Sequence, residues 1–137
     1  MVLVEFAVEE ILSEVHFRST TYLQKNEKLD LYGYRVKIST LRLQTFKKSI
    51  KCARCGRKGN IFKLETNSGE TPHLNFYHDE IPMTRDHIIP LSKGGPDNLA
   101  NSQAMCEPCN TLKADKIQRQ YFTKDIYKLI DNWDLDI

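Results

Sequence analysis

The sequence contains no apolar run that approaches the length of a membrane-spanning helix, so a membrane protein is not expected. Its first helix-like stretch carries Glu5, Glu9, Glu10 and Glu14 in place of the basic start of a secretory signal. Internal repeats, low-complexity tracts and an evident linker are also missing. These absences exclude the membrane, fibrous and disordered classes, and they predict a single domain over residues 1–137 that is located in the cytoplasm.

Acidic residues are absent from residues 35–63, although the formal net charge of the whole chain is only +2. This segment contains ten basic residues: Arg35, Lys37, Arg42, Lys47, Lys48, Lys51, Arg54, Arg57, Lys58 and Lys63. Apolar residues such as Val36, Leu43 and Phe46 are interleaved with them, which indicates a folded surface rather than a loose tail. A block of one charge is either a solvated face or a surface that binds a polyanion, and the charge alone leaves both readings open.

Four cysteines form two identical Cys-x-x-Cys pairs, Cys52 with Cys55 and Cys106 with Cys109. Disulfides are the weaker interpretation because a reducing cytosol would open them, and a redox motif would need a thioredoxin-like setting that the pattern lacks. Two such pairs suit a tetrahedral Zn²⁺ ion with four sulfur ligands. Because sulfur then fills every position, the predicted zinc is structural rather than catalytic.

Apolar spacing predicts the order of the helices and strands. Helices are expected over residues 3–15, from Ser39 or Thr40 to about Ile50, and from Glu107 toward the C-terminus. Short β-prone runs at residues 61–66 and 73–78 surround an Asn-Ser-Gly turn and predict a hairpin. A further strand is expected at residues 83–89 and ends at Pro90, whereas residues 18–37 give no clear pattern.

Residues that could carry chemistry are concentrated between Asp86 and Lys113. His87 follows a carboxylate and could act as a general base near neutral pH. Asp86 and Asn110 offer hard oxygen ligands, which favour Mg²⁺ or Mn²⁺. Asn110 and Lys113 are three residues apart on the expected helix and therefore share a face. The alternative is purely structural, with Asp86 and His87 capping a turn and Asn110 capping the helix.

The run Asp86-His87-Ile88-Ile89-Pro90, Gly94-Gly95, Asn101, Cys106-x-x-Cys109-Asn110 and Lys113 resembles the HNH endonuclease family, in an H-N-N variant. The resemblance implies an α+β fold whose ββα-metal (His-Me finger) core covers residues 50–117 and is supported by the four-cysteine zinc site. The flanks would be an N-terminal helical segment at residues 1–49 and a C-terminal helix at residues 118–137. The resemblance also implies that the cytoplasm in question is that of a bacterial or phage-infected cell.

The resemblance also implies a role for each residue of the motif. His87 would activate the attacking water, while Asp86 and Asn110 would hold one divalent cation, Mg²⁺ or Mn²⁺. Asn101 would brace the loop that orients His87, although Asn98 is an alternative for this position, and Lys113 would contact a phosphate oxygen. Strict strand alternation sends Asp86 and His87 to opposite faces, so a shared site requires an irregularity at that point.

The sequence therefore predicts a metal-dependent endonuclease that hydrolyses DNA, with double-stranded DNA as the expected substrate. The residues expected to contact the phosphate backbone are Arg42, Lys47, Lys48, Lys51, Arg54, Arg57 and Lys58. The terminal helices could serve a homodimer or a protein partner. The alternative function is a non-catalytic four-cysteine zinc module that binds nucleic acid.

Overall fold

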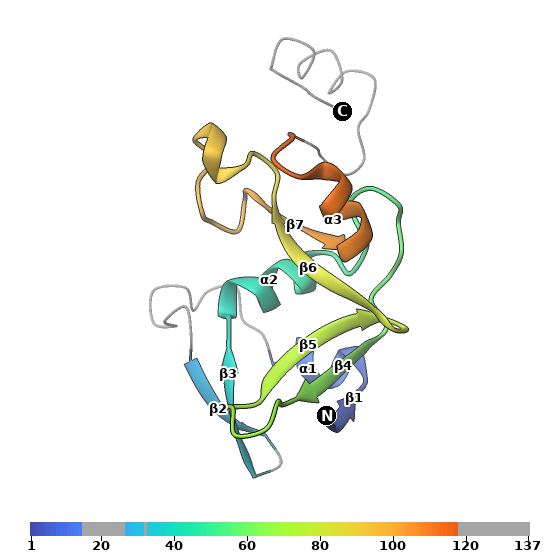
Figure 1. Cartoon of the computed structure of the whole chain (residues 1–137), viewed down its shortest axis with the longest axis vertical. Helices are drawn as coiled ribbons and strands as arrows, with labels where there is room; N and C mark the ends of the chain where they lie inside the picture. The colour runs from blue at the N-terminus through green and yellow to red at the C-terminus, as the bar shows by residue number, and fades with distance from the viewer. Residues whose placement is uncertain (15–26, 32, 118–137) are drawn as a thin grey trace.

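A computed structural model describes residues 1–14, 27–31 and 33–117, and these residues form one mixed sheet with short helices against it (Figure 1). The strands are β1 (Val2–Phe6), β2 (Glu27–Leu31), β3 (Tyr34–Ile38), β4 (Ile61–Glu65), β5 (His73–His78), β6 (Ile81–His87) and β7 (Ser102–Cys106). The helices are α1 (Val8–Leu12), α2 (Thr40–Lys48), the 3₁₀ turn η2 (Leu91–Lys93) and α3 (Glu107–Lys113). None of the described helices combines the length and apolar character that a membrane span requires.

The sheet is antiparallel except at one pairing. Its path runs β1-β4-β5-β3-β2, and β6 joins β5 on one side and β7 on the other. Only β3 and β5 pair in parallel, through Lys37 and His73. In Figure 1, β6, β7 and α3 lie toward one end of the molecule and β1 and β4 toward the other, with α2 between them. Strand β6 thus connects the main sheet to the part of the chain that carries the predicted site.

The N-terminal helix expected over residues 3–15 is present only at its centre. Residues 2–6 form strand β1, which pairs with β4 so that Phe6 lies opposite Phe62. The chain turns into helix at Ala7, whose amide donates to the Glu10 carboxylate at 3.0 Å. An exposed edge of β4 is available to pair, and β-branched residues fit such a pairing, so the sheet overrides the helical spacing. The prediction of a helical flank at residues 1–49 is therefore wrong at β1, β2 and β3.

Three other local predictions agree with the structure, whereas strand β7 was not predicted. Ser39 is the N-cap of α2, β4 and β5 form the expected hairpin, and β6 ends shortly before Pro90. Helix α3 begins at Glu107 and ends at Lys113, sooner than the apolar pattern suggested. The C-terminal helix expected at residues 118–137 lies outside the described residues.

An aromatic core connects the sheet to α2. Phe76 of β5 stacks on Phe62 at a centroid distance of 4.4 Å and contacts Phe46 of α2 at 4.7 Å. A side chain at Gly59 would place its Cβ 2.1 Å from the Phe76 ring, so this position accommodates only glycine. The same buried cluster includes Met83 of β6 together with Met105, Cys106 and Cys109, and it therefore supports the base of the predicted site.

Candidate active site and metal centre

The four cysteine side chains meet at one point. Their Sγ atoms all lie within 4.8 Å of one another, and the Cys55 and Cys106 sulfur atoms are 3.7 Å apart. A tetrahedral zinc site with Zn–S bonds of ~2.3 Å separates its sulfur atoms by about 3.8 Å. The cluster therefore has the chemistry and size to bind a metal ion such as zinc.

Backbone hydrogen bonds shape the first cysteine pair. Gly56 has a φ of +79° directly after Cys55, and its amide donates to the Cys52 carbonyl at 3.0 Å. The Ala53 amide donates to the Ala104 carbonyl at 2.8 Å, which attaches this turn to β7. The second pair, Cys106 and Cys109, lies at the end of β7 and on α3. The cluster thus joins the turn before β4 to the strand and helix of the predicted site.

Nearby donors favour thiolate at part of this cluster. Burial opposes ionisation of the Cys52 thiol, but backbone hydrogen bonds from Cys55, Cys106 and Arg54 outweigh it and lower the pKa of Cys52 to about 7. The Arg57 guanidinium donates to the Cys106 sulfur at 3.4 Å. Burial instead raises the pKa of the Cys109 thiol. A bound cation would offset that cost because it stabilises the deprotonated form of each ligand.

Asp86 is buried on the side of β6 that faces α3. Its carboxylate accepts hydrogen bonds from Lys113 at 3.2–3.3 Å and from the Gln103 amide at 2.9 Å. The Lys113 ammonium also donates to the His87 carbonyl at 2.9 Å, and its side chain is only 1% exposed. Lys113 was expected to contact a phosphate oxygen, but here it neutralises Asp86 and ties α3 to the end of β6. An isolated buried charge is costly, which explains why the two groups pair.

His87 lies on the opposite side of β6 from Asp86, as strict alternation requires. Its Nε2 atom lies 2.9 Å from Asp97 Oδ1, and the Arg85 guanidinium reaches the same oxygen at 2.9 Å. Nδ1 of His87 has no hydrogen-bond partner among the residues that the structure describes. The structure thus brings His87 together with Asp97 and Arg85 rather than with the Asp86 carboxylate.

Sequence reasoning did not identify Asp97 or Arg85 as site residues. Asp97 lies ten positions beyond His87 in a turn of glycine, proline and asparagine, where an aspartate is ordinary turn chemistry. Arg85 lies beside the motif, at the strand position two residues before His87 and therefore on the same face. That spacing was the only available signal for Arg85.

Asn101 fixes the loop between β6 and β7. Its side-chain oxygen accepts the Ile89 amide at 2.9 Å, and its side-chain nitrogen donates to the Ile89 and Pro96 carbonyls at 2.9 and 2.8 Å. Asn98, the alternative for this position, is exposed, and its side-chain oxygen accepts a hydrogen bond from the Asn101 backbone amide at 2.9 Å. The geometry therefore gives the bracing contacts to Asn101.

Asn110 lies on α3 and faces the same side of β6 as Asp86. Its side-chain nitrogen donates to the Thr84 hydroxyl at 2.9 Å, and that hydroxyl donates to the Met105 carbonyl at 2.7 Å. The side-chain oxygen of Asn110 accepts no hydrogen bond from the described residues. Asp86 and Asn110 thus present a carboxylate and an amide oxygen from adjoining elements, which is the donor set of a hard cation.

The basic residues between α2 and β4 fall into two groups. Arg42 donates to the Leu74 carbonyl at 2.8 Å, and Lys48 donates to the Leu99 and Ser102 carbonyls at 2.8 and 2.6 Å. These two side chains therefore hold the fold together. Lys47, Arg54, Arg57 and Lys58 are exposed, and Lys51 is half-buried. The exposed residues of the first cysteine turn are the better candidates for an external polyanion.

One part of the chain matches a known protein family. Residues 75–125 match the HNH endonuclease family. No curated protein and no solved structure matches the chain. The matched segment contains β6, β7 and α3 with Asp86, His87, Asn101 and Asn110, whereas α2 and the first cysteine pair precede it.

Proposed function

We propose that this protein, which carries an HNH endonuclease segment at residues 75–125, is a metal-dependent endonuclease that hydrolyses DNA phosphodiester bonds. The observation that supports it most directly is the succession of β6, a loop, β7 and α3. His87 lies at the end of β6, Asp86 lies on the side of β6 that faces α3, and Asn110 lies on α3 itself. A substrate phosphate lying across the end of β6 would reach both sides of the strand, because His87 is its last residue.

His87 is the proposed general base. With Nε2 bonded to Asp97, the proton of the neutral ring is held on Nε2 and the lone pair is on Nδ1. Nδ1 would take a proton from water as the water oxygen bonds to phosphorus. The bond from phosphorus to the 3′-oxygen then breaks with its electron pair, and the 3′-oxygen takes a proton from solvent water, which leaves a 5′-phosphate and a 3′-hydroxyl. Asp97 acts as a positioning residue that sets the tautomer and orientation of the ring, as carboxylates do beside other catalytic histidines.

Asp86 and Asn110 would hold the catalytic Mg²⁺ or Mn²⁺. A divalent cation there would neutralise the scissile phosphate and stabilise the departing 3′-oxygen. The Lys113 ammonium already contacts both oxygens of the Asp86 carboxylate. A metal cation that binds Asp86 must therefore replace Lys113 at one of these oxygens. We therefore expect weak metal binding without substrate and a need for added metal during cleavage.

The four cysteines would hold a structural zinc ion. All four positions around the metal are sulfur, so no position remains for water or substrate. Its role is to fix the start of α3, and with it Asn110 and Lys113, against the first cysteine turn. The double-stranded form of the substrate and assembly through the terminal segments stay predictions.

The exposed residues Arg54 and Lys58 are proposed to contact the DNA backbone. Each neutralised phosphate contributes about −0.9 to the slope of log affinity against log salt concentration. The Arg54→Ala, Lys58→Ala double variant should therefore flatten the slope by about 1.8 without changing sequence preference. Binding titrations at several salt concentrations measure it, with Arg35→Ala on β3 as the control for loss of an exposed charge elsewhere. An unchanged slope in the double variant would make these residues a solvated face.

The direct test of the proposed function is cleavage of supercoiled plasmid by the purified protein. Nicked or linear product is expected with Mg²⁺ or Mn²⁺ and not with EDTA, while zinc content measured in the same samples stays constant. The competing function, a non-catalytic zinc module that binds nucleic acid, predicts intact plasmid in both and binding that does not depend on Mg²⁺. Intact plasmid with either metal present would therefore reject the endonuclease.

A further inference from the structure

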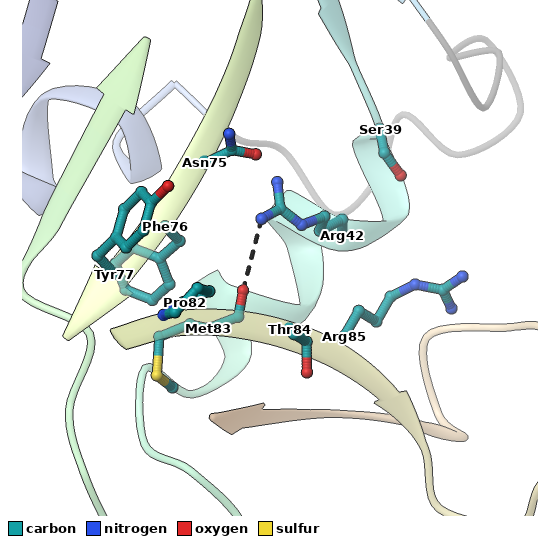
Figure 2. Close-up of a pocket in the computed structure, with 9 residues that line it drawn as sticks. All are labelled: Ser39, Arg42, Asn75, Phe76, Tyr77, Pro82, Met83, Thr84 and Arg85. Carbon is teal, nitrogen blue, oxygen red and sulfur yellow. Dashed lines mark hydrogen bonds between the residues drawn. The ribbon is translucent and has the colours of Figure 1, made fainter. Parts of the chain in front are cut away.

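A pocket of about 530 Å³ opens between the start of α2 and strands β5 and β6 (Figure 2). The residues that line it include Ser39, Arg42, Asn75, Tyr77 and Arg85. Figure 2 shows Arg42 reaching from α2 toward the gap between Asn75 on β5 and Met83 on β6. No aspartate or glutamate lines this pocket. Of the two guanidinium groups in this lining, that of Arg85 already pairs with the Asp97 carboxylate at 2.9 Å, which leaves Arg42 as the cation that faces the pocket.

Among the residues that the structure describes, no carboxylate pairs with the Arg42 guanidinium. This guanidinium donates to the Leu74 carbonyl at 2.8 Å and to the Met83 carbonyl at 3.5 Å, and it lies 5.1 Å from the centroid of the Phe46 ring. Burial lowers the pKa of Arg42 to about 10. Carbonyl dipoles and a ring face only partly replace the hydration that the cation loses. An anion in the pocket would supply the missing charge.

The acids bonded to residues of this lining are already engaged, and one of them, Asp97, pairs with Arg85. The Glu65 carboxylate on β4 accepts hydrogen bonds from the Tyr77 hydroxyl and from the Asn75 amide, the latter at 3.2 Å. Burial, together with the hydrogen bond to Glu65 and repulsion from its charge, raises the pKa of Tyr77 to about 12, so the hydroxyl stays neutral. Two neutral donors thus already engage this carboxylate. Glu65 reduces the positive potential of the pocket without occupying it.

The start of α2 adds unpaired donors at the rim. The first amides of an α-helix have no carbonyl partner within the helix, and Ser39 makes no side-chain cap bond to them. The first turn of α2 also contains no acidic residue. The positive end of the helix dipole therefore adds to the Arg42 guanidinium.

Arg85 connects the pocket to the proposed base. Its guanidinium and the His87 ring bond the same Asp97 oxygen, each at 2.9 Å, and both side chains project from the same side of β6. A nucleic-acid chain with one phosphate at the end of β6 could run along β6 and place a neighbouring phosphate over the pocket.

We infer that the pocket between α2, β5 and β6 binds a non-scissile phosphate group of the nucleic-acid substrate. The identity of the ligand in this inference rests on the proposed function. The subsite is new because Ser39 and Arg42, at the start of α2, lie outside the segment that matches the HNH endonuclease family. Free inorganic phosphate has the same chemistry, so the test must separate the two sources.

Ser39 allows a test that leaves the guanidinium groups and the proposed catalytic residues in place. Ser39→Asp puts a negative charge at the rim, and Ser39→Asn is its neutral counterpart; both residues are as good at a helix N-cap as serine. Affinity for a short DNA duplex, measured at low salt without added divalent cation, should fall roughly tenfold for Ser39→Asp and stay near wild type for Ser39→Asn. Inorganic phosphate should shift the side-chain N–H signal of Arg42 in nuclear magnetic resonance spectra, and less in Ser39→Asp.

Equal DNA affinities for the two variants would overturn the inference. A phosphate-induced shift of Arg42 together with equal DNA affinities would assign the pocket to free phosphate and reject the nucleic-acid subsite. None of these measurements uses cleavage. Failure of the nuclease proposal, seen as intact plasmid, is therefore distinguishable from failure of the pocket proposal, seen in the binding of the Ser39 variants.

Discussion

The Cys106→Ser protein is expected to lose its zinc and to unfold at least around β7 and α3. Cys106 is fully buried, ends β7 and stands at the N-cap of α3, so its sulfur connects both elements to the first cysteine turn. Zinc binding in small structural sites contributes about 10–16 kcal/mol of apparent free energy. Whole domains are stable by only about 5–15 kcal/mol, so a weakened site is enough to destroy the fold. Zinc content by elemental analysis and the thermal unfolding midpoint measure the effect.

Cys55 provides the matched control, because it is the exposed member of the cluster. A serine there removes almost no core packing, so any large loss of stability must come from the lost metal ligand. Cys55→Ser should therefore lower the unfolding midpoint nearly as much as Cys106→Ser. If purified wild-type protein holds no zinc, or Cys55→Ser melts like wild type while only Cys106→Ser is unstable, the cysteines contribute packing and not a metal site.

The helices and strands that could be predicted from sequence depend on signals local to each element. Helix α2 has Ser39 at its start, the β4–β5 hairpin surrounds an Asn-Ser-Gly turn, and β6 stops before Pro90. Strand β1 could not be predicted in this way. Its apolar spacing also fits a helix, and what makes it a strand is the edge of β4, which lies some sixty positions away in the chain.

The residues of the candidate site also divide into those with a local sequence signal and those that only the tertiary structure identifies. The cysteines, Asp86 and Asn110 belong to contiguous motifs, and their types alone indicate metal chemistry. Composition could not separate Arg42 and Lys48 from the other basic residues, because their hydrogen bonds to backbone carbonyls of distant segments are a tertiary property. The pairing of Lys113 with Asp86 and of His87 with Asp97 depends on how α3 and the loop after β6 fold back on that strand. Side-chain contacts of this kind leave no periodic signal.

His87→Ala is expected to reduce plasmid cleavage by about 100- to 10,000-fold, the usual contribution of a general base. The side chain is about one-fifth exposed and packs in no core cluster, so zinc content, unfolding midpoint and DNA affinity should stay close to wild type. His73→Ala is the matched control, because His73 is an exposed histidine at the start of β5. Added imidazole should restore part of the cleavage by His87→Ala and leave His73→Ala unchanged. If His87→Ala cuts at the wild-type rate, the base is another group.

Asp97→Asn separates the base from the residue that positions it. The asparagine oxygen can still accept a hydrogen bond from Nε2 of His87 and from Arg85, but it carries no charge to hold the ring tautomer. We expect kcat to fall by about 10- to 100-fold with little change in KM, because partners of this kind typically contribute that much. Nitrogen chemical shifts of the His87 ring should show the proton on Nε2 in wild type and a mixture of tautomers in Asp97→Asn. A lowered kcat without any change in tautomer would mean that Asp97 acts on the loop, and unchanged kinetics would remove it from the site. Only the combination of a slower step and a changed tautomer assigns Asp97 to the orientation of the base.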